Sequence, residues 1–286
     1  MLILHDPQCA GYGSSMRPEQ PARVVKSAAH LRAAHPPWGW RVPPPAPDAA
    51  LLLAHTPGHL RRLAHGPDFD ADTPYFDGIL DHARRAAGAA VDAAGRALAN
   101  RSPVFSLMRP PGHHATATQA MGFCYLNQIA IAALHARANL GAARVAIWDV
   151  DAHHGNGTEA ILHNRDGILF TSVHQHPGYP GTGTLSFDNC RNWPVPPHAP
   201  RADHLAAIRA ALDAVIAFAP DLVLVSAGFD AYAGDPITEM TLEIEDFATL
   251  GRWLRECNLP AAAILEGGYS NDLPLLIDAF LSAWDT

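Results

Sequence analysis

The sequence predicts an α/β protein with a mainly parallel central sheet and helices on both faces. Two features lead to this prediction. Short runs rich in β-branched and other apolar residues alternate with longer helical patterns, as expected for β-α-β units. Of the 286 residues, 48% are hydrophobic and 17% are charged, which is enough apolar material for a large core. Because no linker or repeat divides the chain, we expect one domain over residues 1–286.

The predicted elements follow one another along the chain. Strands are expected at Val104–Leu107, Arg144–Asp149, Ile168–Val173, Leu222–Ser226 and Ala261–Leu265. Helices are expected at Ala83–Ala99, Gly122–Ala138, Thr158–Asn164, Asp203–Ala219 and Glu245–Cys257. The proline-rich segment Arg41–Pro47 is interpreted as a loop. In a sheet of this kind, ligands bind beyond the carboxyl ends of the strands.

Composition excludes several classes of function. Lys and Arg number 20 against 28 Asp and Glu, so the formal net charge is -8. This argues against nucleic acid as a direct partner and mildly favours a cationic substrate. The four cysteines are scattered, as is typical of a reducing compartment. No stretch resembles a signal peptide or a membrane span, so we expect a cytoplasmic protein without membrane contact.

Polar clusters follow the carboxyl ends of four predicted strands. In chain order these clusters are 109–114, Asp151 with His153, Asp230, and Tyr269. Since the carboxyl ends of parallel strands meet at one edge of a sheet, we expect the four clusters to converge there.

One cluster has the residue types of a metal site. Asp151 and His153 are two residues apart, so on extended chain their side chains point the same way. A capping aspartate and a packed histidine would explain this pair about as often. Asp230 adds a third candidate, although a turn or helix-capping role is the alternative. Two carboxylates and one imidazole leave a position open for water, as in catalytic zinc sites, and bound zinc lowers the pKa of that water to about 7.

Two further clusters carry groups suited to proton transfer and hydrogen bonding. His113 and His114 follow a stiff Pro-Pro-Gly turn, and one of them could act as a base, although adjacent histidines in a loop are more often inert. Tyr269 follows a double glycine, where its phenol could donate to a substrate carbonyl. A turn alone would also explain that motif.

The other histidines are expected to be solvated side chains, among them His30, His35, His55, His82 and His163.

Six motifs together resemble those of the histone deacetylase and acetylpolyamine amidohydrolase superfamily. They are RPPGHHA at 109–115, GFCYLN at 122–127, DVDAHHGNGT at 149–158, PGYPGTG at 177–183, AGFDA at 227–231 and EGGY at 266–269. A weaker match lies at 17–23. The resemblance covers about 103–269 and implies an arginase-deacetylase fold. It further implies a zinc-dependent hydrolase that removes an acetyl or other acyl group from an amine such as acetyl-lysine or an acetylpolyamine.

The resemblance also assigns roles to individual residues. It gives the zinc ligands as Asp151, His153 and Asp230. His114 corresponds to the general base and later proton donor, His113 to its electrostatic partner, and Tyr269 to the group that polarises the carbonyl. Asp149 and Asn156 correspond to the partners that orient the two imidazoles. Asn156 replaces an aspartate of class I members, which suggests a class II or bacterial type. A structural potassium site is implied at Asp149, Asp151, His153 and Ser172.

The same resemblance indicates a narrow substrate tunnel. Phe123 and Tyr179 correspond to its aromatic walls, and Gly122 lets an alkyl chain pass close to the backbone; core packing is the alternative for either aromatic. Asp72 is a candidate rim carboxylate, although surface loops carry aspartates routinely. Ile237 stands where relatives specialised for polyamines can carry an acidic residue, so this position does not select polyamines.

Two alternative functions are compatible with parts of these motifs. A ureohydrolase would need a second metal, whose ligands would stand at Gly155 and Gly228, and glycine cannot supply them. An inactive protein that only binds acylated amines is expected to have lost a ligand, the base or the tyrosine, yet all are present. The physiological substrate, the acyl preference, the choice between zinc and iron(II) and the oligomeric state stay open.

Overall fold

An eight-stranded sheet forms the centre of the protein. The computed structural model describes residues 1–285. The strands lie in the order β2-β1-β3-β8-β7-β4-β5-β6, and every neighbouring pair is parallel. Their bounds are β1 Leu2–Leu4, β2 Gly39–Arg41, β3 Val104–Ser106, β4 Val145–Asp149, β5 Ile168–Gln175, β6 Cys190–Val195, β7 Leu222–Ala227 and β8 Ala261–Leu265. The expected mainly parallel sheet is confirmed.

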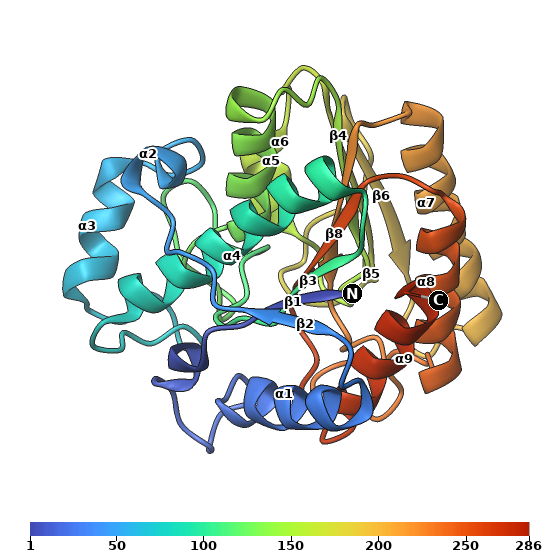
Figure 1. The fold of residues 1–286 in the computed structure, drawn as a ribbon, viewed down its shortest axis with the longest axis horizontal. Coiled ribbons are helices and arrows are strands. Elements are labelled where there is room, and N and C mark those ends of the chain that lie inside the picture. The colour runs from blue at the N-terminus through green and yellow to red at the C-terminus, as the bar shows by residue number, and fades with distance from the viewer. Residues whose placement is uncertain (286) are drawn as a thin grey trace.

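Helices cover both faces of this sheet, as expected. Figure 1 shows α4 and α5 on one side of the strands, and α7, α8 and α9 on the other. The bounds are α1 Ala22–Ala34, α2 Asp48–Leu51, α3 Pro57–His65, α4 Ile79–Asn100, α5 Gln128–Asn139, α6 Asn156–Leu162, α7 Arg201–Phe218, α8 Ile244–Glu256 and α9 Leu273–Asp285, with a short 3-10 helix at Pro7–Ala10. No helix within residues 1–285 has both the length and the apolar character needed to cross a membrane.

The central strands and the helices on them form the core. Every residue of β4, β7 and β8 is buried, and such near-continuous apolar runs are typical of parallel strands covered on both faces. Alanines fill the buried side of α4. At Gly88 of this helix, an added Cβ would lie 2.1 Å from the carbonyl oxygen of Pro44. Residues 42–47 of the proline-rich segment therefore form a loop that packs directly against α4, whereas Arg41, expected in the same loop, ends β2.

Three strands were not predicted from the sequence. β1 and β2 have three residues each, which is too short for an alternating pattern to be recognised. β6 contains Pro194, which argues against a central strand. The structure places β6 at the edge of the sheet, where a missing N–H is tolerated.

One predicted helix begins later than expected. The pattern suggested a helix from Gly122, but α5 begins only at Gln128. Asn127 ends the preceding loop and caps the helix, because its side-chain oxygen accepts a hydrogen bond from Ala130 N at 2.9 Å. Residues 122–127 are therefore free to form a loop, and this loop reaches the pocket described below.

Candidate active site

Asp151, His153 and Asp230 meet just beyond the carboxyl ends of β4 and β7. These strands are neighbours, with Asp149 in register with Ser226, so the loops that follow them lie side by side. His153 Nδ1 is 2.9 Å from Asp230 Oδ2 and 3.2 Å from Asp151 Oδ1. One ligand atom from each of the three residues lies within 4.8 Å of the others. The three residues thus form a group that can hold a metal ion.

Backbone amides orient both carboxylates. Asp230 Oδ1 accepts a hydrogen bond from Ala152 N at 2.8 Å, and Asp151 Oδ2 accepts one from Gly267 N at 2.7 Å. Gly267 comes this close because it has no side chain: a Cβ there would lie 2.1 Å from Asp230 Oδ2. Each carboxylate therefore keeps one oxygen turned toward His153.

The group favours a positive charge at its centre. Asp151 and Asp230 are fully buried, and two buried carboxylates are costly unless a cation compensates them. Burial would lower the pKa of His153, but the carboxylates of Asp230 and Asp151 outweigh it and raise that pKa well above 6.5. The same carboxylates that stabilise a positive charge on His153 would stabilise a divalent cation among the three side chains, so the residues present fit a metal.

The two extra ligands of a binuclear ureohydrolase site do not fit in this structure. At Gly155 an added Cβ would lie 2.3 Å from Asp149 Oδ2, and at Gly228 it would lie 2.2 Å from Asp151 Oδ2. No ligating side chain could stand at either position without moving these carboxylates. The binuclear alternative is therefore excluded by space as well as by residue type.

His113 and His114 differ in charge because their partners differ. His113 Nδ1 lies 3.1 Å from Asp149 Oδ2. Burial would lower the pKa of His113, but the carboxylates of Asp151 and Asp149 raise it to about 10. His114 Nδ1 lies 2.8 Å from the amide oxygen of Asn156. Burial and the charges of His113 and His153 lower the pKa of His114 well below 6.5.

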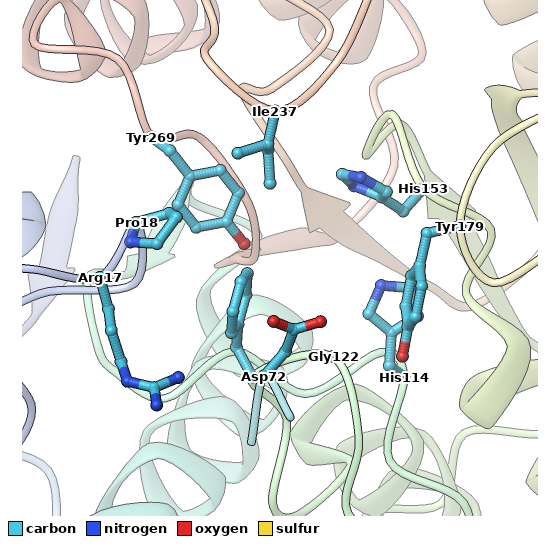
Figure 2. A pocket seen from close by; sticks show the side chains of 10 residues that line it. Arg17, Pro18, Asp72, His114, Gly122, His153, Tyr179, Ile237 and Tyr269 are labelled. Atoms are coloured by element: carbon cyan, nitrogen blue, oxygen red, sulfur yellow. The ribbon is translucent and has the colours of Figure 1, made fainter. Parts of the chain in front are cut away.

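These pKa shifts give the two histidines distinct protonation states near neutral pH. His113 carries a proton on each nitrogen, while His114 is neutral. Since a neutral His114 donates from Nδ1 to Asn156, its Nε2 is left as an acceptor. His114 lines the pocket and its imidazole faces inward in Figure 2, so an unprotonated nitrogen is available there.

Tyr269 is held by two residues that sequence reasoning missed. Asp235 Oδ2 accepts a hydrogen bond from Tyr269 N at 2.7 Å. Arg23 donates from Nε to Gly268 O at 2.7 Å, and its guanidinium lies 4.7 Å from the centre of the Tyr269 ring. Burial raises the pKa of Tyr269 well above 10, so its hydroxyl keeps its proton. The only hint in the sequence was that Arg23 belongs to the weaker motif at 17–23.

A pocket of about 270 Å³ opens over these groups. All five residues predicted to contact substrate line it, together with His114, His153 and Tyr269. The five are Asp72, Gly122, Phe123, Tyr179 and Ile237. Arg17 and Pro18 also line the pocket and were not predicted. Figure 2 shows these side chains surrounding a common space.

Aromatic rings line this pocket in two pairs. The ring of Phe123 is 5.6 Å from that of Tyr269, and the ring of Tyr179 is 5.1 Å from His114. Gly122 lies between these pairs with φ +55°, and a Cβ there would approach the His114 ring to 2.6 Å. Glycine is therefore required both by the backbone conformation and by the space.

A buried layer supports the loop that carries His113. The expectation of a solvated side chain is wrong for His55, which is 4% exposed and stacks on His59. Burial lowers the pKa of His55 to about 3, and its neutral Nε2 accepts from Asn127 N at 2.8 Å. Asn127 Nδ2 in turn donates to Ala115 O at 3.0 Å. The histidine thus has a structural contact instead of a solvent-exposed position.

Comparison with known proteins identifies the family. A model of the histone deacetylase domain matches residues 17–282, so the chain belongs to the histone deacetylase family. The histone deacetylase-like amidohydrolase of Pseudomonas aeruginosa is 37% identical over 284 residues, which cover 92% of this chain and 74% of that protein. The protein is accordingly a deacetylase, an enzyme that hydrolyses amide bonds, from a family that is normally metal-dependent.

Two solved structures share the architecture. The crystal structure of the HDA15 HD domain has a TM-score of 0.91 and 31% identity, covering 99% of this chain and 90% of that one. The acetylpolyamine aminohydrolase from Burkholderia pseudomallei has a TM-score of 0.90 and 28% identity, covering 99% and 98%. The expected arginase-deacetylase fold is confirmed.

The hydrogen bond between His114 and Asn156 leads to a testable prediction about the pKa of His114. In the variant Asn156→Asp, a carboxylate faces Nδ1 and stabilises the protonated imidazole, so the pKa of His114 should rise by about one to two units. NMR titration of the His114 ring measures this shift. Asn100→Asp is the control, since Asn100 is exposed at the end of α4, before β3 and away from the pocket. An unchanged His114 pKa in Asn156→Asp would contradict the assigned hydrogen bond.

Proposed function

We propose that the protein is a zinc-dependent deacetylase that removes an acetyl group from a linear N-acylated alkylamine. One observation carries this proposal: a single pocket brings together a metal-ligand group, a neutral imidazole and a protonated phenol. Metal-assisted amide hydrolysis uses these three kinds of group. Fold similarity alone would not support it, because a fold hosts many activities.

Asp151, His153 and Asp230 are proposed to hold the zinc. Their two carboxylate oxygens and one imidazole nitrogen are ligands that zinc accepts, with a position left open. When bound, zinc supplies a water of lowered pKa and polarises the amide carbonyl. The backbone hydrogen bonds to Asp151 and Asp230 keep the ligand oxygens in place before any metal arrives.

His114 is proposed to move the proton. Its Nε2 accepts a proton from the attacking water and later donates it to the nitrogen of the leaving amine, so that acetate and a free amine are formed. Asn156 keeps the proton of the neutral ring on Nδ1, which leaves Nε2 able to accept. His113, held in its charged form by Asp149, places a fixed positive charge beside the developing negative charge.

Tyr269 is proposed to stabilise the oxygen of the substrate carbonyl. Its hydroxyl remains protonated and points into the pocket in Figure 2. A donor directed at an oxygen that becomes negative only in the transition state raises turnover more than it raises binding. The contacts from Asp235 and Arg23 fix the tyrosine so that it does not have to reorganise during the reaction.

The walls of the pocket favour an unbranched chain. Phe123 and Tyr179 are proposed to press on the alkyl chain between them, and Gly122 supplies backbone without bulk. Branched or bulky acylamines would collide with the rings. Ile237 at the rim is apolar and provides no charge that would attract the distant ammonium of a polyamine.

A potassium ion is proposed as a second, structural cation. Asp149 and Ser172 are paired across β4 and β5, and Asp151 and His153 follow in the same loop. Oxygen ligands from these residues would suit a hard monovalent cation. Ser172 Oγ lies 2.9 Å from His174 Nδ1. Burial lowers the pKa of His174 to about 3, so His174 itself brings no positive charge to Ser172.

Metal removal tests the proposed function. The purified protein should contain about one zinc per chain, and hydrolysis of N-acetylated alkylamines should disappear with strong chelation and return with zinc. Asp151→Asn should abolish both metal content and activity. Asp166→Asn, an identical change at an exposed position before β5, is the control. Activity that survives complete metal removal would end the proposal, and binding of acylated amines without turnover would favour the inactive alternative.

Tyr269→Phe tests the proposed role of the phenol. The variant should fold normally and lose turnover by a few hundredfold, or about 3 to 4 kcal/mol, as is typical for one donor to an oxyanion. Tyr75→Phe is the matched control, because the Tyr75 hydroxyl donates to Ala64 O outside the pocket. A lower melting temperature with turnover largely kept would instead show that Tyr269 is a packing residue.

A further inference from the structure

Two oppositely charged side chains stand together at the mouth of the pocket. Arg17 and Asp72 both line it, and both also line a small adjoining cavity beside Phe123. Arg17 Nη1 lies 3.4 Å from the carbonyl oxygen of Ala71, the residue before Asp72. Figure 2 shows the guanidinium of Arg17 and the carboxylate of Asp72 on the same side of the lining.

Neither the guanidinium of Arg17 nor the carboxylate of Asp72 forms an ion pair within residues 1–285. No salt bridge of up to 4.0 Å involves Arg17 or Asp72 over that range. The single contact of Arg17 to Ala71 O is long and leaves its other N–H groups available. A ligand at the mouth would therefore meet one free cation and one free anion.

Both side chains stand on segments that are anchored. Asp70 Oδ1 accepts from Asp72 N at 2.9 Å, and Thr73 Oγ1 accepts from Phe123 N at 3.0 Å, which ties this turn to the aromatic wall. On the other segment, Glu19 is buried and accepts from Arg109 Nη2 at 2.6 Å. The two charges are thus held at the rim by the body of the protein.

We infer that the pocket selects a free amino acid, Nε-acetyl-lysine, whose α-carboxylate meets Arg17 while its α-ammonium meets Asp72. This inference rests on the proposed deacetylase function of the same site. Its reaction is balanced by one water: the amide C–N bond breaks, the acetyl carbon forms a new C–O bond to the hydroxyl and leaves as acetate, and the ε-nitrogen of lysine takes the proton.

Charge distinguishes this substrate from the other candidates. An acetylpolyamine would bring only positive charge to the mouth, where Arg17 repels it. An acetyl-lysine within a peptide would bring neutral amides, which form no ion pair with Arg17 or with Asp72. A zwitterion supplies both signs, and guanidinium binds carboxylate with paired hydrogen bonds. The net charge of -8 favours cations over the whole surface, but the lining of the pocket includes one arginine and one aspartate, Arg17 and Asp72.

A matched set of substrates tests the inference on the zinc-loaded enzyme. Nε-acetyl-lysine carries both charges, Nε-acetyl-lysinamide and N-acetylcadaverine lack the carboxylate, and 6-acetamidohexanoate lacks the ammonium. We expect kcat/KM for Nε-acetyl-lysine to exceed each of the others by about five- to tenfold, as is reasonable for partly exposed charge pairs. A peptide with an internal acetyl-lysine and N-acetylspermidine should fall in the lower group.

Two variants assign the preference to its residues. Arg17→Gln should bring the ratio of Nε-acetyl-lysine to Nε-acetyl-lysinamide toward one, whereas Asp72→Asn should do so for the ratio to 6-acetamidohexanoate. Arg191→Gln is the control, because exposed Arg191 also donates to a single backbone carbonyl, that of Asp188, but lies outside the pocket. The ratio of kcat/KM values for two substrates, measured with the same variant, does not depend on how much of the enzyme is folded.

The outcomes separate the inference from the function on which it rests. Equal kcat/KM for all four compounds, or a tenfold preference for the peptide or for N-acetylspermidine, overturns the inference and leaves the deacetylase proposal intact. Ratios that are unchanged in Arg17→Gln also overturn it. Failure to hydrolyse any of the amides with zinc bound overturns both.

Discussion

The structure depends on two carboxylates held together in the interior. Asp151 and Asp230 lie beside one imidazole with no exposure to solvent, an arrangement that is unfavourable without a compensating cation. Hydrogen bonds from backbone N–H groups offset part of the free-energy cost of burying each carboxylate, and Gly267 allows the backbone to approach them. The charges of His113 and His114 depend on the same surroundings: nearby carboxylates stabilise the protonated form of His113, whereas burial and the charges of His113 and His153 keep His114 neutral.

The parallel sheet explains why residues so distant in sequence can meet at this group. β7 lies between β4 and β8, so the loops after these three strands supply Asp151, Asp230 and Tyr269 from adjacent positions. β3, on the other side of β8, leads into the turn with His113 and His114. Glu266 joins the two loops, since its buried Oε2 accepts from Gly112 N at 2.6 Å. A fixed scaffold of this kind is what preorganised catalysis requires.

The sequence predicted the residues that follow strand ends, because motif spacing and the rule for parallel sheets both act locally. It could not reveal contacts that depend on how distant segments pack. Arg23 reaches Gly268, 245 positions away along the chain, and Arg17 meets the turn with Asp72 across 54 positions. His55 gave the clearest error, because a helical or loop position says nothing about whether the side chain will be covered. Short strands such as β1 and β2 form only because neighbouring strands pair with them.

The most direct test of this account is the unfolding temperature of the protein with and without zinc. If the two buried carboxylates need a cation, zinc at about a hundred times its Kd should raise the melting temperature by about 5 °C or more. In Asp230→Asn, which removes one of the two charges and a ligand, most of this increase should be lost. Equal melting temperatures for the zinc-loaded and zinc-free protein would contradict the claim that the carboxylate pair is built around a metal.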